Sequence, residues 1–159
     1  MNSVTSLHII YASTSGHTEY VVDTLMAYLK EKAANLEITK QAAEQASPGD
    51  LLRGNLLILA SGTWNTGGVE GQMNPHMHEF LLKRAATADL KGRRVSIIAL
   101  GDERYYYTSR AGEHLRSFVQ SHGGVIAGDP LVVVNEPYGQ EIRIHKWGSQ
   151  LVSLLPQSL

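Results

Sequence analysis

The fold of this chain is decided by the stretch Ile9-Ile10-Tyr11-Ala12-Ser13-Thr14-Ser15-Gly16-His17-Thr18. Its first part is mostly apolar, which predicts a strand buried on both faces of a parallel sheet. The part that follows is rich in hydroxyl groups and contains a glycine, and an amphipathic helix is expected directly after it, over about residues 18–33. The free N–H groups of a helix start and nearby hydroxyl groups can bind a phosphate without lysine or arginine. The stretch therefore predicts a phosphate site.

Two interpretations of this turn stay open on its residues alone. Serine and threonine also gather before helices simply because their side chains cap the free N–H groups. The chain contains neither the Walker motif G-x-x-x-x-G-K-[ST] nor the dinucleotide motif G-x-G-x-x-G, which argues against a nucleoside triphosphatase and a dinucleotide-binding fold. A ligand that binds here is therefore expected to carry a monophosphate.

Strands and helices alternate along the rest of the chain. Further strands are expected at residues 36–39, near a sheet edge, at residues 55–60 and 95–100, and at residues 125–134, interrupted by Gly128-Asp129-Pro130. Helices are expected from Ser47, from Asn74, and over residues 109–122 and 141–155. The alternation predicts an α/β fold, a doubly wound five-stranded parallel sheet with helices on both faces. The length of 159 residues predicts a single domain over residues 1–159.

Three unusual loops follow the ends of predicted strands, at residues 13–18, 61–71 and 101–107. In a parallel sheet these ends share one edge, where ligands of such folds bind. The second loop has four glycines in eleven residues, from which we expect no regular structure. In the helix after it, we expect the side chains of Met77, Phe80, Leu81 and Leu82 to point into the core.

Composition excludes several classes of function. The formal net charge of -1 argues against an extended nucleic-acid interface. The absence of cysteine excludes disulfides, thiolate nucleophiles and cysteine-bound metal clusters, so redox chemistry would need a bound cofactor. We expect no membrane association, since the apolar runs are far shorter than the ~20 residues that a span needs. The N-terminal residues lack the pattern of a secretion signal, so we expect a cytoplasmic protein.

The three loops together resemble those of the flavodoxins. Ser13-x-Ser15-Gly16-x-Thr18 is similar to the loop that binds the FMN phosphate in that family, Ser61-Gly62-Thr63-Trp64-Asn65 to its second flavin loop, and Gly101-Asp102-x-x-Tyr105 to its third. The motifs occur in the family's order and span essentially the whole chain. Since no long insertion splits the last strand, the chain resembles the short-chain type.

The resemblance implies a site for noncovalently bound FMN. It places Trp64 on the inner face of the isoalloxazine ring and Tyr105 on the outer face, although Tyr106 or Tyr107 could replace Tyr105. Asn65 stands where the family often has glycine, and Asp102 would position its loop, or form only a local turn. The implied cofactor-binding residues are Ser13, Thr14, Ser15, Gly16, His17, Thr18, Thr63, Trp64, Asn65, Thr66, Gly67, Gly101, Asp102, Tyr105 and Tyr107, with no catalytic residue and no metal ligand.

The implied function is that of a low-potential one-electron carrier. Its partners would be redox proteins that dock transiently, a reductase as donor and an oxidoreductase as acceptor, and the carrier would be a monomer. The alternative is an FMN-dependent NAD(P)H:quinone reductase of the related flavodoxin-like group, since Gly71-Gln72-Met73 has a faint likeness to a loop of that group. A signalling module without flavin is disfavoured, because the acidic cluster of a phosphoacceptor site is missing.

Overall fold

A parallel sheet forms the centre of the protein, whose computed structural model describes residues 5–66, 69–101 and 110–155. β1 (Thr5–Ala12) pairs with β2 (Leu36–Ala42) on one side and with β3 (Leu56–Thr66) on the other. β3 pairs in turn with β5 (Arg94–Gly101). The last position is shared by β6 (Val125–Ile126) and β7 (Leu131–Val134), which both pair with β5 in parallel. The predicted sheet is confirmed, including its edge strand β2 and the interruption before Leu131.

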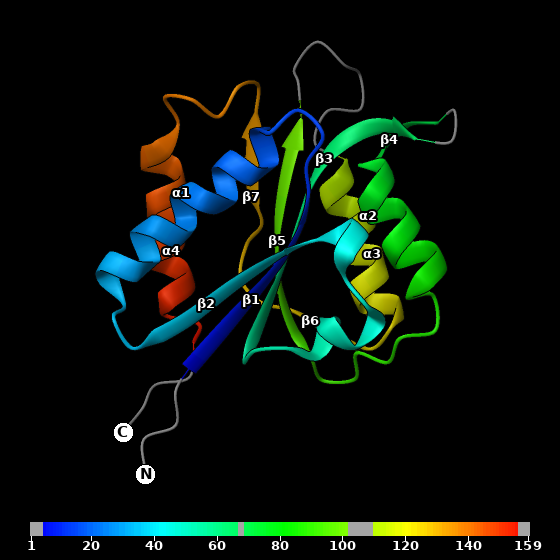
Figure 1. The fold of residues 1–159 in the computed structure, drawn as a ribbon, viewed down its shortest axis with the longest axis horizontal. Helices are drawn as coiled ribbons and strands as arrows, with labels where there is room; N and C mark the ends of the chain where they lie inside the picture. The colour runs from blue at the N-terminus through cyan, green and yellow to red at the C-terminus, as the bar shows by residue number, and fades with distance from the viewer. Residues whose placement is uncertain (1–4, 67–68, 102–109, 156–159) are drawn as a thin grey trace.

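Helices cover both faces of the sheet (Figure 1). α1 (His17–Lys32) and α4 (Glu141–Val152) lie on one face, and α2 (Pro75–Glu79) and α3 (Ala111–Ser121) on the other. Two short 3-10 turns, η1 (Ala43–Gln45) and η2 (Pro48–Leu52), connect β2 to β3. α4 approaches α1 closely at Gly148, where a Cβ atom would lie 2.9 Å from Leu25 Cδ1.

The apolar side chains of the strands pack into two hydrophobic core layers, one on each face of the sheet. Along β3, Ile58 and Ala60 pack towards α1 and α4, whereas Leu57 and Leu59 pack towards α2 and α3. All four are fully buried, because successive side chains of a strand point to opposite faces and both faces are covered. Burial of each leucine or isoleucine contributes about 1.5–3 kcal/mol, which makes these continuous runs the main stabilising feature of the sheet.

The glycine-rich second loop is a β-hairpin, so the expectation of no regular structure there was wrong. β3 continues to Thr66, and β4 (Val69–Met73) runs back antiparallel to it. The register shifts between the pairs Trp64–Gln72 and Thr66–Val69, which leaves an extra residue on β4. Gly71, with φ 75°, lies at this bulge. Glycine therefore permits the strand pairing here rather than preventing it.

Other predicted boundaries shift by a few residues. β2 is longer than expected and ends at Ala42, which pairs with Tyr11, and α4 ends at Val152. Leu82, expected in the core, is 46% exposed. The cause is a π-helical turn, η3 (Phe80–Arg84), in which the Ala85 N–H donates to the Phe80 carbonyl, 2.7 Å away. This wider turn keeps Phe80 and Leu81 buried but rotates Leu82 outward.

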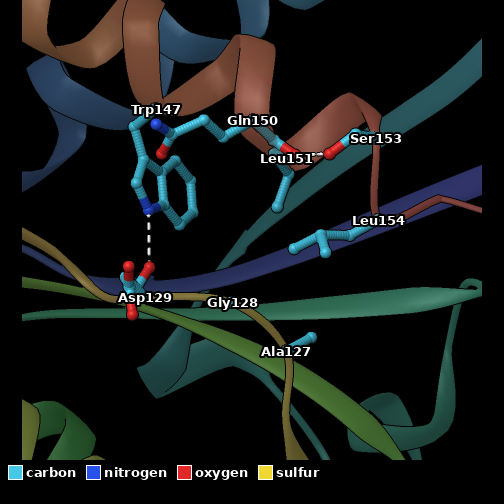
Figure 2. A pocket seen from close by; sticks show the side chains of 8 residues that line it. All are labelled: Ala127, Gly128, Asp129, Trp147, Gln150, Leu151, Ser153 and Leu154. Carbon is cyan, nitrogen blue, oxygen red and sulfur yellow. Dashed lines mark hydrogen bonds between the residues drawn. The ribbon is translucent and has the colours of Figure 1, made fainter.

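The β6–β7 connection packs against the C-terminal half of α4. Trp147 Nε1 donates a hydrogen bond of 2.8 Å to the carbonyl of Asp129, and the two elements enclose a shallow pocket of about 230 Å³ beside Leu154 (Figure 2). Among the residues that the structure describes, no helix is both long enough and apolar enough to cross a membrane.

His8 is a buried histidine at the centre of β1, with 1% of its surface exposed. Its Nε2 lies 3.2 Å from Gln41 Oε1, and its Nδ1 lies 2.6 Å from Thr39 Oγ1. Because the Gln41 amide nitrogen donates to the Gln45 carbonyl, Oε1 is the atom that faces the histidine. Nε2 therefore carries the proton of a neutral ring, and Nδ1 accepts from the Thr39 hydroxyl. Burial lowers the pKa of His8 below its ordinary value of 6.5.

This lowered pKa predicts an acid-dependent loss of stability. Above pH 6.5 the ring is neutral in both folded and unfolded states, whereas below that value the unfolded chain takes up the proton more readily. The free energy of unfolding, measured in urea, should therefore fall below pH 6.5 by up to about 1.4 kcal/mol per pH unit more in the wild type than in His8→Leu. Parallel pH profiles for the two proteins would contradict this assignment.

Candidate functional site

The carboxyl ends of β1, β3 and β5 lie side by side at one edge of the sheet (Figure 1), where Ala12 pairs with Ser61 and Gly62 with Leu100. The N–H of Ala111, at the start of α3, donates to Thr63 Oγ1 at 3.1 Å, which ties the start of α3 to β3. Gly101 ends β5, and its carbonyl accepts from the N–H of Asn135 at 2.7 Å. The expected site residues Gly67, Asp102, Tyr105 and Tyr107 lie outside the described residues.

Ser13 organises the first loop. Its Oγ accepts hydrogen bonds from the N–H groups of Gly16, at 3.1 Å, and Glu19, at 3.4 Å. Gly16 has φ 92°, and the α1 hydrogen bonds begin with the Tyr20 N–H donating to its carbonyl. Ser13 thus caps part of the helix start, as one of the two interpretations of the turn expects. Because both lone pairs of Oγ accept from backbone, its hydroxyl hydrogen remains available to a ligand.

The helix start is not fully capped by Ser13. Within the described part of the chain, the N–H groups of Thr14, Ser15, His17 and Thr18 donate no hydrogen bond. These amides are gathered in the turn and the first residues of α1, where the helix dipole adds positive potential. A turn that presents free N–H groups and a free hydroxyl hydrogen matches an acceptor-only group such as phosphate.

Glu19, in the first turn of α1, forms an ion pair with Lys40 from β2. Glu19 accepts from Lys40 Nζ at 2.9 Å and from the Tyr11 hydroxyl at 3.0 Å. The hydrogen bond from Lys40 lowers the pKa of the Glu19 carboxyl. Lys40 also contacts Asp23, 2.8 Å away. One lysine from β2 therefore offsets one of the two negative charges in the first turns of α1, which reduces their repulsion of an anion at the helix start.

Trp64 meets the first loop at Gly62. A Cβ atom on Gly62 would lie 3.1 Å from Trp64 Nε1 and 3.7 Å from Thr18 Oγ1, so glycine gives the indole its place beside the helix start. Thr18 is buried, whereas 37% of Trp64 is exposed. Thr66, further along the hairpin, donates to the Met73 carbonyl at 2.7 Å. The hairpin thus holds a partly exposed indole next to the turn of residues 13–18.

Asn74 links the two loops and was not anticipated as a site residue. It is fully buried, and its N–H donates to Ser61 Oγ at 3.0 Å and to the Gly62 carbonyl at 3.1 Å. Its side-chain Nδ2 donates to Thr14 Oγ1 at 2.9 Å, and its Oδ1 accepts from the His76 N–H at 2.9 Å. An asparagine before a proline signals a helix start, but the bond to Thr14 joins residues 60 positions apart and leaves no local signal.

Aromatic side chains border the first loop on the α4 side. The ring of His17 meets Tyr138 edge-on at 5.6 Å, and Tyr138 meets Tyr20 at 4.8 Å. The Tyr20 hydroxyl donates to Glu141 at 2.5 Å, which lowers the pKa of that carboxyl. The His17 side chain is thereby directed towards α4.

Comparison with known proteins identifies the family. The flavodoxin family model matches residues 9–147, which include the first loop, the hairpin, Asn74 and the end of β5. The chain belongs to the flavodoxin family. It is therefore an FMN-binding electron carrier, as the resemblance implied, and none of these matches favours the quinone reductase alternative.

Individual flavodoxins match along most of their length. The chain is 29% identical over 144 residues to a flavodoxin of Maridesulfovibrio salexigens, covering 89% of this chain and 92% of the relative. It is 26% identical over 148 residues to a flavodoxin of Nitratidesulfovibrio vulgaris, covering 92% and 97%. Oxidised flavodoxin 1 of Bacillus cereus has the same fold, with a TM-score of 0.82 at 22% identity, over 96% of this chain and all of that one.

The turn of residues 13–18 depends on the left-handed backbone of Gly16, so a substitution there should lower the stability of the protein. A Cβ atom there meets no other atom within 4 Å, so any penalty arises from φ 92° alone. Gly16→Ala should lower the free energy of unfolding of the apoprotein in urea by about 1–2 kcal/mol. Gly49 is the matched control, since it also has open space but no positive φ. Equal effects of Gly16→Ala and Gly49→Ala would contradict this account.

Proposed function

We propose that the FMN phosphate binds in the turn from Ser13 to Thr18, held by amide and hydroxyl hydrogens alone. The observation that carries this proposal is the set of backbone N–H groups, at Thr14, Ser15, His17 and Thr18, that make no hydrogen bond to any of the described residues. The hydroxyl hydrogen of Ser13 adds a further donor. No lysine or arginine occurs in the turn, so the helix dipole and these hydrogen bonds supply the attraction.

The flavin ring is proposed to lie against Trp64 on its inner face. The support is the exposed indole beside Thr18 and the flat π surface that it offers to an aromatic ligand. Tyr105 is proposed for the outer face on the strength of its sequence motif. The remaining proposed contacts come from the second and third loops: Thr63, Asn65, Thr66, Gly67, Gly101, Asp102 and Tyr107.

The bound FMN would supply the ability to accept and donate single electrons. The protein's own task is then to hold and shield the ring. Trp64 and Tyr105 would exclude water from its faces and disfavour negative charge on the reduced ring, because the faces of aromatic rings are electron-rich. A low potential for electron transfer is the expected consequence.

The carrier is proposed to act as a monomeric single domain over residues 1–159 that docks transiently on a reductase and on an oxidoreductase. Family membership supports electron exchange with redox partners. The absence of cysteine is compatible with a reducing compartment, and we propose the cytoplasm. Cell fractionation tests the location, and light scattering of the FMN-loaded protein should give the 17.4 kDa of one chain.

Parallel titrations with FMN and riboflavin test the phosphate site, because riboflavin lacks the phosphate. Quenching of flavin fluorescence should show tighter binding of FMN to the wild type. Ser13→Ala combined with Thr18→Ala should weaken FMN binding by about tenfold or more, through loss of hydrogen bonds to a charged group, and leave riboflavin nearly unchanged. Ser121→Ala, at the end of α3, is the control. Unchanged FMN affinity in the double variant, or a wild type that binds no FMN, would refute the proposal.

A further inference from the structure

The buried side chain of Asn74 has only one possible orientation. Its Oδ1 accepts from the His76 N–H at 2.9 Å, and a backbone N–H can only donate. The amide nitrogen must therefore be the atom that faces Thr14, where Nδ2 and Oγ1 are 2.9 Å apart. The Asn74 backbone N–H is held by Ser61 and Gly62, so the residue is fixed at both its main chain and its side chain.

The Asn74 amide hydrogen that Thr14 Oγ1 accepts restricts the directions in which the Thr14 hydroxyl hydrogen can point. Since Oγ1 accepts from Asn74, the hydroxyl hydrogen is left to point elsewhere. No acceptor for this hydrogen is found among the described residues, and Thr14 is exposed in the same turn as the free amide of Ser15. The Thr14 hydroxyl hydrogen is therefore available as a donor to a ligand at the turn.

We propose that Asn74 is a positioning residue that sets the polarity of the Thr14 hydroxyl, so that its hydrogen is directed at the FMN phosphate. This inference rests on the proposed phosphate site. The Ser13 hydroxyl also accepts hydrogen bonds on one side, but its donors are backbone N–H groups. Substituting a side chain cannot turn a backbone N–H into an acceptor. Thr14 takes its donor from a side chain, so its polarity can be inverted by one substitution.

Asn74→Asp makes that inversion with little change of shape. Aspartate keeps an acceptor for the His76 N–H, so the helix cap of α2 is preserved. Its other carboxylate oxygen accepts the Thr14 hydroxyl hydrogen, which would turn a lone pair towards the phosphate. Asn74→Ser is the second variant, because serine also caps helices but is too short to reach Thr14. Thr14→Val removes the hydroxyl at nearly constant volume, and Thr14→Ser restores it.

The dissociation constants of FMN and riboflavin, measured at pH 8 for each variant, test the inference. Asn74→Asp should weaken FMN binding by about tenfold or more and riboflavin binding by less than about twofold. Thr14→Val and Asn74→Ser should weaken FMN binding less than Asn74→Asp, and Thr14→Ser should bind FMN almost as the wild type does. Urea unfolding of each apoprotein identifies a variant that fails to fold, and Thr14→Val with Thr14→Ser then still tests the hydroxyl.

The combined variant separates hydroxyl polarity from simple charge repulsion. An aspartate would repel the phosphate whether or not Thr14 carries a hydroxyl. If Asn74 acts through that hydroxyl, Asn74→Asp should weaken FMN binding at least about threefold less in the Thr14→Val background than in the wild type. Equal losses in both backgrounds would overturn the inference and leave the phosphate site intact. Equal affinity of the wild type for FMN and riboflavin would instead refute the phosphate site itself.

Discussion

A phosphate can be held in a turn without cations only if the polar groups there present hydrogens and not lone pairs. The turn from Ser13 to Thr18 meets this requirement through tertiary structure. The left-handed conformation of Gly16 turns the backbone into the start of α1. Ser13 Oγ accepts hydrogen bonds from the N–H groups of Gly16 and Glu19. The remaining amides make no hydrogen bond to the described residues and lie at the positive end of α1. Electrostatics then favour an anion although the chain is close to neutral overall.

The rest of the fold keeps this turn in place. The runs of buried residues in β1 and β3 set the two strand ends side by side, with Ala12 paired to Ser61. Gly62 provides the space in which the indole of Trp64 lies beside Thr18. Asn74, itself fully buried, then joins the turn, the β3–β4 hairpin and α2 by hydrogen bonds to Thr14, Ser61 and the His76 N–H. An electron carrier gains from this rigidity, because a cofactor held in one position needs little rearrangement between its redox states.

The sequence was sufficient to predict the sheet and the order of its strands along the chain, whereas the FMN contacts at its carboxyl edge stay a prediction. The apolar runs of β1, β3 and β5, and the helix that follows the serine-rich turn, are local patterns. The hairpin was missed because a glycine can signal either a break or a bulge. Gly71 lies at a bulge because β3 and β4 pair on both sides of it, at Trp64–Gln72 and at Thr66–Val69. Leu82 was misplaced because a π-helical turn shifts the helical period. The role of Asn74 depends on contacts distant in sequence, which no local pattern encodes.

The most direct measurement of the phosphate site is the amide proton spectrum of ¹⁵N-labelled apoprotein during titration with FMN and, separately, with riboflavin. Hydrogen bonds to a dianionic phosphate should move the amide protons of Thr14, Ser15, His17 and Thr18 strongly downfield with FMN and leave them nearly unmoved with riboflavin. Residues along the β3–β4 hairpin should respond to both ligands, since both carry the ring. Identical responses of the four turn amides to FMN and riboflavin would contradict a phosphate held by this turn.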